Sequence, residues 1–230
     1  LGDVYKRQVP MQGVVPLCKS FDTVGPITKT VEDAALIFSV ITGNKPVDLQ
    51  YPSIVGGRLA LLKGTALDDL NQKSAIAFEQ TVNRLSKFGF EIKEIDIDEV
   101  ESALALSSIL YPSEAYAEWK EEIEASPELM YDEILQRFRG GKDVLASDYL
   151  KAMSDLEIFK KKYENKISEF DGVILPTCPI LPPNLDRLKS DNDYYVSQNL
   201  MALRNTRIGN LMGVCALTIP TNHSSCGLSI

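Results

Sequence analysis

The chain has 230 residues, 44% of them hydrophobic, which is enough to fill the core of one large α/β domain. Its net charge of −8 at pH 7 comes without a cluster of Lys and Arg, which argues against nucleic acid and anionic membranes as partners. No apolar stretch approaches the about 20 residues that a membrane-spanning helix needs, and no segment resembles a signal peptide. We therefore expect a cytoplasmic protein.

The first eight residues, LGDVYKRQ, match the translation of a transposon adapter that is used to prepare sequencing libraries. A natural basic N-terminus would require this match to be a coincidence, so we expect residues 1–8 to be non-native. The native sequence is then expected to begin at Val9, and its gene to continue upstream.

The N-terminal part of the chain combines a loop with a helix. Val9–Leu17 is an extended run with Gly and Pro, typical of a loop or an edge strand. Helical spacing of apolar residues predicts a helix that begins after Thr30, with Asp33 completing a capping box, and ends at Gly43. Asn44–Gly57 is rich in turn residues and is expected at the surface.

The next segments have the pattern of a βαβ unit. The apolar run Arg58–Gly64 predicts a buried strand, and the periodic segment Ala75–Phe88 predicts a helix that is closed by Gly89. Phe90–Ile97 predicts a second strand. Connections of this length favour parallel strands with a right-handed crossover.

Helices dominate the stretch that follows. Apolar spacing predicts two mainly helical segments, Val100–Lys120 and Pro127–Phe138. A long helix with a polar face is predicted over Leu145–Phe170, with Ser147 as its cap.

Two further strands complete the predicted sheet. Asp171–Pro183 begins as an apolar strand, which should stop near Pro176 because proline cannot serve a central ladder. A helix containing Asn205–Met212 leads into Val214–Pro220, which is expected to be a buried strand. The whole pattern predicts one α/β domain with a mixed, twisted sheet and helices on both faces.

Motifs for metal, disulfide or nucleophilic chemistry are missing from the sequence. The cysteines form no CxxC pair, and we expect reduced thiols in mostly apolar surroundings at Cys18, Cys178, Cys215 and Cys226. His223 is the only histidine, which excludes an HExxH zinc site, and the neighbouring Ser224–Ser225 pair lacks an acidic partner. There is no GxSxG elbow, SxxK pair or glycine-rich serine loop. These motifs alone predict no evident active site.

Four sequence blocks in a fixed order resemble the amidase signature family. The first, Gly13–Gly43, contains SFDTVGP and is similar to the family's S-[LF]-D-x-x-G-P segment and the helix after it. The others are the strand, helix and strand from RLALLKG to DIDEV, then YEN…FDGVILPTCPILPP, and finally NTRIGNLMGVCALTIPTN. Together they cover Val9–Ile230 without a break, and the first block is the most specific.

The resemblance implies a partial amidase-signature fold and a hydrolase of carboxylic amides that uses no metal or cofactor. The implied catalytic set is a lysine, a serine with a cis peptide bond and a nucleophilic serine, with backbone N–H groups holding the oxyanion. In the family this set precedes the segment that matches Ser20–Pro26, so no catalytic residue is assigned to this chain. Residues 9–230 are then expected to be the downstream portion of a single amidase domain, truncated at both ends and inactive by itself.

The resemblance also assigns weaker roles to individual residues. Asp22 is expected to cap backbone N–H groups in the turn before Gly25 and Pro26, a structural role rather than a substrate contact. Thr177, in the turn at a strand end, and Asn210 are candidates for lining the substrate pocket.

Three functions stay open at this point. The first is an amidase acting on a small-molecule amide, and the second is an amidotransferase A subunit, which usually has Gln where this chain has Thr23. The third is a non-catalytic binding domain on the same fold. A homodimer or amidotransferase partner subunits are the expected assemblies, Leu104–Arg139 is a candidate lid or pocket wall, and apolar surface should be exposed where a missing part would cover it.

Overall fold

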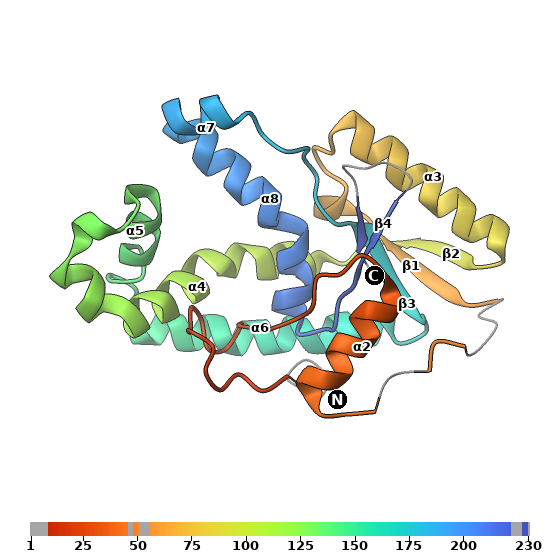
Figure 1. Cartoon of the computed structure of the whole chain (residues 1–230), viewed down its shortest axis with the longest axis horizontal. Coiled ribbons are helices and arrows are strands. Elements are labelled where there is room, and N and C mark those ends of the chain that lie inside the picture. Colours follow the sequence, from red (N-terminus) through yellow and green to blue (C-terminus); the bar gives the residue numbers. More distant parts are fainter. Residues whose placement is uncertain (1–8, 46–47, 51–55, 222–226, 230) are drawn as a thin grey trace.

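The computed structural model describes residues 9–45, 48–50, 56–221 and 227–229. They form a mixed five-stranded sheet with helices on both faces, which confirms the predicted fold class (Figure 1). The strands follow the order β2-β1-β3-β5-β4, in which β1 pairs in parallel with β2 and β3, and the other pairs are antiparallel. Their bounds are β1 Arg58–Leu62, β2 Glu91–Ile95, β3 Gly172–Pro176, β4 Thr218–Pro220 and β5 Gly227–Ser229.

The predicted βαβ unit is present, with α3 (Gln72–Phe88) joining β1 to β2. The Asn71 side chain caps the start of α3 by accepting a hydrogen bond from the Lys73 N–H, and Gly89 ends the helix at a φ of 108°. Leu59 and Leu61 of β1 pack with Phe78 of α3 on one face of the sheet. Because alternate residues of a strand face opposite ways, Leu62 joins the core on the other face.

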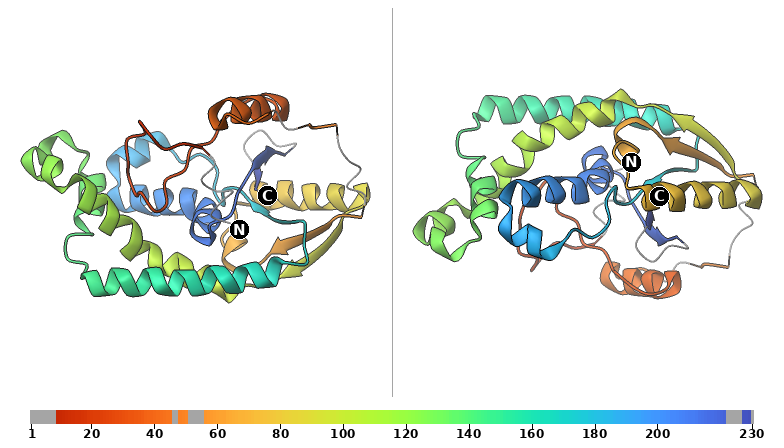
Figure 2. Two further views of the ribbon diagram at one scale, coloured as in Figure 1. Left: turned by 90° about the horizontal axis from the view of Figure 1, so that it is seen from below. Right: turned by 90° about the horizontal axis from the view of Figure 1, so that it is seen from above.

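Three helices cover that other face: α4 (Asp98–Ala125), α6 (Ala146–Ile167) and α8 (Asn192–Met212). We call them the helical layer, and Figure 2 shows α6 and α3 on opposite sides of the sheet. The core of this layer is closed, since Leu110, Leu156 and Leu211 are each 0% exposed. Each of these helices contains or overlaps a predicted one, but α4 and α8 run further than the sequence pattern indicated.

Shorter elements connect the strands and the longer helices. The connections contain η1 (Gly64–Ala66), η2 (Pro127–Leu129), α5 (Asp132–Arg139) and α7 (Leu185–Ser190).

Two sequence predictions are wrong. Ser147 does not cap α6, because the helix begins at Ala146 and Leu145 occupies the cap position. The Leu145 side chain makes no capping hydrogen bond. Val214–Pro220 is a strand only over its last three residues, and these are exposed rather than buried.

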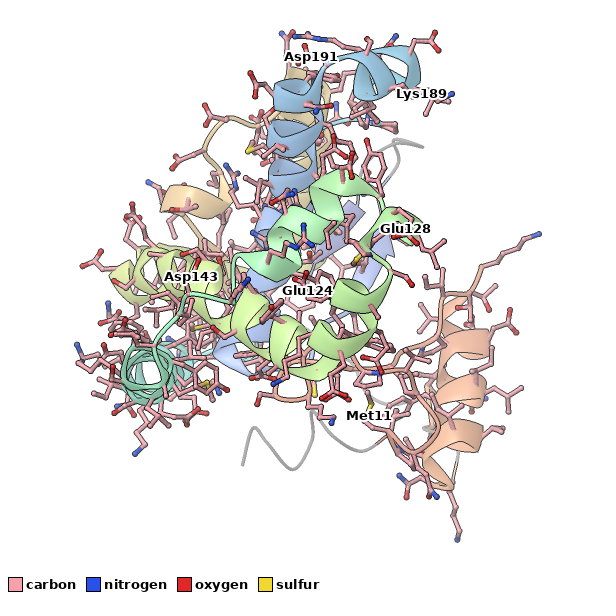
Figure 3. All side chains as sticks on the ribbon, turned by 90° about the vertical axis from the view of Figure 1, so that its left-hand side faces the viewer. Met11, Glu124, Glu128, Asp143, Lys189 and Asp191 are labelled. Carbon is pink, nitrogen blue, oxygen red and sulfur yellow. The ribbon has the colours of Figure 1, made fainter. Side chains whose placement is uncertain are left out.

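The N-terminal arm, residues 9–43, consists of a loop and α2 (Val31–Thr42). The Thr30 hydroxyl accepts a hydrogen bond from the Asp33 N–H, and Gly43 ends the helix at a φ of 69°, as the sequence predicts. The helix is apolar but hardly covered: Val40 is 73% exposed and Leu36 is 54% exposed. Figure 3 shows α2 standing beside the main body, with side chains projecting into solvent. Within the described ranges, no helix combines the length and apolar character needed to cross a bilayer.

Candidate functional site

The candidate site is built around the turn Leu17–Asp22, which contains the start of the SFDTVGP segment. The Asp22 carboxylate accepts hydrogen bonds from the N–H groups of Leu17 at 2.8 Å and Cys18 at 3.1 Å. The Cys18 carbonyl oxygen closes the turn by accepting from the N–H groups of Phe21 and Asp22. Asp22 therefore caps backbone N–H groups as expected, but these groups lie upstream of it rather than toward Gly25 and Pro26.

Gly25 and Pro26 have a less defined place in the structure. Gly25 is exposed, and a Cβ added there would meet no atom within 4 Å. Pro26 is half-buried. The motif role of these two residues stays a prediction.

The turn is anchored on the helical layer by polar groups that sequence analysis did not identify. The Ser20 N–H donates to one oxygen of Glu114 at 2.9 Å, and the Tyr149 hydroxyl donates to the other at 2.7 Å. The Cys18 thiol donates to the Tyr111 carbonyl oxygen. Tyr111 and Glu114 lie on α4 and Tyr149 on α6, so two helices of the layer hold the turn.

Asn210 connects α8 to the same place. Its amide nitrogen donates to the Phe21 carbonyl oxygen at 2.8 Å, and its amide oxygen accepts from the Tyr111 hydroxyl at 2.9 Å. The Phe21 and Tyr111 rings pack edge to face beside these bonds, with centroids 4.9 Å apart. This geometry gives Asn210 a fixed structural position next to the turn, and its assignment to a substrate pocket stays a prediction.

Thr177 follows β3 at the carboxyl end of that strand and is half-buried. Asn205, a buried polar residue of α8, lies close to the same strand end and donates to the carbonyl oxygens of Ala66 and Pro176 at 2.9 and 2.7 Å. Sequence reasoning missed this asparagine, although it stands in the same NTRIGN block as Asn210. The pocket role of Thr177 stays a prediction.

A small hollow lies elsewhere, at the carboxyl ends of β1 and β2. Its volume is about 50 Å³, room for a few waters rather than for an amide substrate. Polar and charged residues account for most of its lining, among them Lys63, Thr65, Asp96, Asp98 and Glu101. Neither Thr177 nor Asn210 lines it, and among the residues that the structure describes no three His, Cys, Asp or Glu side chains are grouped to hold a metal ion.

The Cys18 thiol and the hydroxyls of Tyr149 and Tyr111 are held in their neutral forms. Burial, together with the charges of Glu114 and Asp22, raises the pKa of the Cys18 thiol to about 12. Burial and the hydrogen bond to Glu114 raise the pKa of Tyr149 to about 12, and burial raises the pKa of Tyr111 further still. Lys19 pairs with Glu118 at 2.5 Å. These groups can donate hydrogen bonds and position the turn, but none of them is an activated nucleophile.

Cys215 is exposed, which corrects the expectation of apolar surroundings, and Cys178 is half-buried. His223, the Ser224–Ser225 pair and Cys226 lie outside the described residues.

Comparison with known proteins gives a consistent result. A family model described as Amidase matches residues 6–230. The chain is 30% identical to 2-amino-5-chloromuconic acid deaminase of Comamonas testosteroni, over 96% of this chain and 49% of the relative. It is also 30% identical to the A subunit of the glutamyl-tRNA(Gln) amidotransferase of Sulfurisphaera tokodaii, over 95% of this chain and 53% of the relative. The chain thus spans about half the length of these relatives.

Solved structures agree with the fold. A crystal structure described as an amidase superposes with a TM-score of 0.79 at 20% identity, covering 97% of this chain and 51% of the other. That likeness concerns the fold alone.

Proposed function

The chain belongs to the amidase family, and we propose that it is the downstream portion of an amidase domain that hydrolyses carboxylic amides to an acid and ammonia or an amine. The observation that carries this proposal is the family match over residues 6–230. The anchoring of the SFDTVGP segment on α4, α6 and α8 supports it, since a turn so firmly held is suited to positioning neighbouring catalytic groups.

The proposed chemistry uses a lysine, a bridging serine and a nucleophilic serine. The lysine would take the proton of the nucleophile through the bridging serine, and backbone N–H groups would stabilise the oxyanion. We assign none of these roles to a residue of this chain, because its sequence has no glycine-rich serine loop and its buried Cys18 thiol is held neutral. We therefore propose that the 230-residue chain hydrolyses no amide when it is alone.

The N-terminal arm has a place in this proposal. The apolar residues of α2 that face solvent, Val31, Leu36, Ile37 and Val40, suit a surface that another part of the amidase domain covers. We propose that the part carrying the catalytic residues packs on α2 and on the turn Leu17–Asp22.

The source DNA upstream of codon 9 provides the first test. The proposal expects a reading frame that encodes a lysine and then a GGSSGG-like loop. Expression of that longer frame should give ammonia release from benzamide or a similar aryl amide, and the 230-residue chain should give none. Replacement of the loop's nucleophilic serine by alanine is the matched control for background hydrolysis.

The outcomes separate the functions that the sequence left open. An upstream frame without the lysine and without the loop would contradict the amidase proposal. An intact frame in which only the lysine or the serines are replaced would favour the non-catalytic binding domain. Turnover by the 230-residue chain, freed of contaminating hydrolases, would contradict its proposed inactivity.

The amidotransferase A subunit is the second candidate function. It is supported by the 30% identity to the Sulfurisphaera tokodaii protein, whereas Thr23 stands where that subunit type usually has Gln. Genes for partner subunits beside this one, and glutamine-dependent ammonia release only in their presence, would favour it over a free-standing amidase.

A further inference from the structure

The short helix α5 carries two buried polar atoms that have no hydrogen-bond partner. They are the Oε2 of Glu133 and the Nη2 of Arg137, and among the described residues no other buried side-chain nitrogen or oxygen lacks a partner. The two residues are one helical turn apart and so lie on one face of α5. A buried polar atom that makes no hydrogen bond is destabilising, and the cost is larger for a charged group. The position of α5 is therefore held against a local cost that contact with water would remove.

Two side-chain contacts hold this face of α5 on α8. The Arg137 Nη1 donates to the side-chain oxygen of Asn199 at 2.6 Å. The ring of Tyr131, just before α5, packs edge to face on the ring of Tyr195, with centroids 5.4 Å apart. We call these two contacts the latch. Because Tyr131 remains 52% exposed, the latch is not part of a closed core such as the helical layer has.

The C-terminal end of α5 is fixed to α4 instead. Arg139 donates two hydrogen bonds to the Glu124 carboxylate, at 3.0 and 2.7 Å. Gly141 lies so close to α4 that a Cβ there would fall 2.0 Å from the Pro112 carbonyl oxygen. Figure 3 looks onto this end of the molecule, where α5 lies in front of α4 and α8. One end of α5 is thus anchored and its other half is only latched, which is the arrangement of a hinged lid.

The helix α5 has little stability of its own. It is 8 residues long, the Tyr131 side chain at its cap position makes no capping hydrogen bond, and Leu135 is its buried residue. Helices shorter than about 12 residues are marginal in water unless packing supports them. Such an element opens locally at a lower free energy than the whole protein unfolds.

The face of α8 under the latch continues to the candidate site. Asn199 and Asn210 are about three helical turns apart, so they lie on the same face of α8. Asn210 donates to the Phe21 carbonyl oxygen of the anchored turn. A lid that leaves Asn199 therefore uncovers the start of a helix face that ends at the turn.

We propose that α5 is a lid that opens from α8 about its own C-terminal end. The latch holds the lid closed, and the buried Glu133 carboxylate favours its opening. Opening brings the Glu133 Oε2 and the Arg137 Nη2 into water, which offsets the loss of the latch contacts. The lid narrows the segment Leu104–Arg139, which the sequence suggested as a lid or pocket wall, to its last helix. The inference concerns the chain as it stands and does not rest on the proposed hydrolysis.

Hydrogen exchange of the 230-residue chain, followed by mass spectrometry, tests the opening. We expect the amides of α5 to exchange at least about tenfold faster than those of α6 around Leu156, because α5 opens without unfolding of the layer. Asn199→Ala removes the acceptor of the latch and should accelerate exchange in α5 about threefold or more, with α6 unchanged. The matched control is Ser197→Ala, at an exposed residue of α8 whose hydroxyl donates to the Tyr194 carbonyl oxygen of its own helix.

A substitution with the opposite effect separates a lid from a merely weak helix. Glu133→Gln replaces the buried carboxylate by a neutral amide, which costs less to bury, so exchange in α5 should slow about threefold or more. Asp132→Asn removes an exposed carboxylate from the same first turn and is the matched control for the interaction with the helix dipole. It should not slow the exchange of α5.

Three outcomes would overturn the inference. The first is equal exchange in α5 and α6, and the second is an Asn199→Ala variant that accelerates both helices alike. The third is a Glu133→Gln variant whose α5 exchanges no more slowly than in Asp132→Asn. If Asn199→Ala does not fold, Tyr131→Leu tests the latch in its place with the same expectation, since it removes a ring that is half exposed. None of these outcomes bears on the proposed hydrolysis, which the longer reading frame tests.

Discussion

The helical layer and the N-terminal arm both have apolar residues at helical spacing, yet only the layer closes its own core. Leu156 of α6 is 0% exposed, whereas Leu36 of α2 is 54% exposed. The layer closes its core because its three helices pack on one another and on a face of the sheet, while α2 has no such neighbours in the described part of the chain. The helical pattern of α2 therefore determines its local structure but does not provide the surface that it packs against.

The two regions meet at the turn Leu17–Asp22, where Cys18 and Phe21 join the buried core of the layer and hydrogen bonds anchor the backbone. Glu114 accepts from the Ser20 N–H and Asn210 donates to the Phe21 carbonyl oxygen, while the Tyr149 hydroxyl donates to the other oxygen of Glu114. The arm is thus attached through the turn rather than through the apolar residues of α2. Substitutions in the two regions test whether stability resides in the layer.

Matched Leu→Ala substitutions give the strongest contrast. Leu156→Ala leaves a cavity in the closed core and should lower the free energy of unfolding by about 2–5 kcal/mol. Leu36→Ala removes an exposed side chain of α2 and should change it by less than about 0.5 kcal/mol. Urea denaturation of both variants measures the difference. Comparable losses at the two sites would show that α2 is covered in solution.

A glycine packed against the helical layer and a glycine of the arm give the next contrast. A Cβ at Gly141 would fall into the backbone of α4 at Pro112 and within 2.7 Å of the Ser113 nitrogen. Gly141→Ala should therefore destabilise the protein by about 1–3 kcal/mol through overpacking. Gly25→Ala in the arm meets no atom within 4 Å and serves as the control in the same thermal melts. An unchanged melting temperature for Gly141→Ala would contradict the close approach of the two backbones.

Sequence patterns predict local structure well in both regions. Thr30, Asn71 and the glycines that end α2 and α3 act as caps through bonds to residues only a few positions away, so their signals are contained in short windows. Thr30 and the glycines were identified in advance for that reason. Burial is different: Val214–Pro220 is an apolar run, yet Leu217 is 65% exposed, because exposure depends on which element lies opposite.

In the candidate site, too, the sequence identifies contacts between neighbouring residues but not contacts between distant ones. Asp22 was identified because a carboxylate next to a turn caps nearby N–H groups, and its bonds reach only five residues. Glu114 was missed because its partner Ser20 is 94 residues away, and nothing around Glu114 distinguishes it from other acidic residues of a helix.

Removing the Asp22 side chain, which caps the turn, should destabilise the protein less than the core substitution Leu156→Ala. Asp22→Ala removes the acceptor for the N–H groups of Leu17 and Cys18 and should cost about 0.5–2 kcal/mol, as the loss of a helix cap does. Hydrogen exchange of these two amides should accelerate more than that of amides in α6. Asp143→Ala, at an exposed carboxylate labelled in Figure 3, is the matched control and should leave the exchange of Leu17 and Cys18 unchanged. Equal exchange rates in both variants would place the anchor of the turn elsewhere.

Tyr163→Phe is expected to change the stability least at neutral pH. Its effect at alkaline pH tests the closure of the helical layer alone. Burial raises the pKa of Tyr163 on α6 to about 12, whereas the arm contains no tyrosine. The unfolded chain ionises this hydroxyl near the ordinary pKa of about 10, so its contribution is complete below that pH and is lost as the pH rises through the folded value. At pH 7, Tyr163→Phe should change the free energy of unfolding by less than about 0.5 kcal/mol. At alkaline pH, the variant should keep more of its free energy of unfolding than the unaltered protein does. Urea denaturation at both pH values measures this, and parallel alkaline losses in the two proteins would show that Tyr163 is solvated and that the layer is less tightly closed than the arm comparison requires.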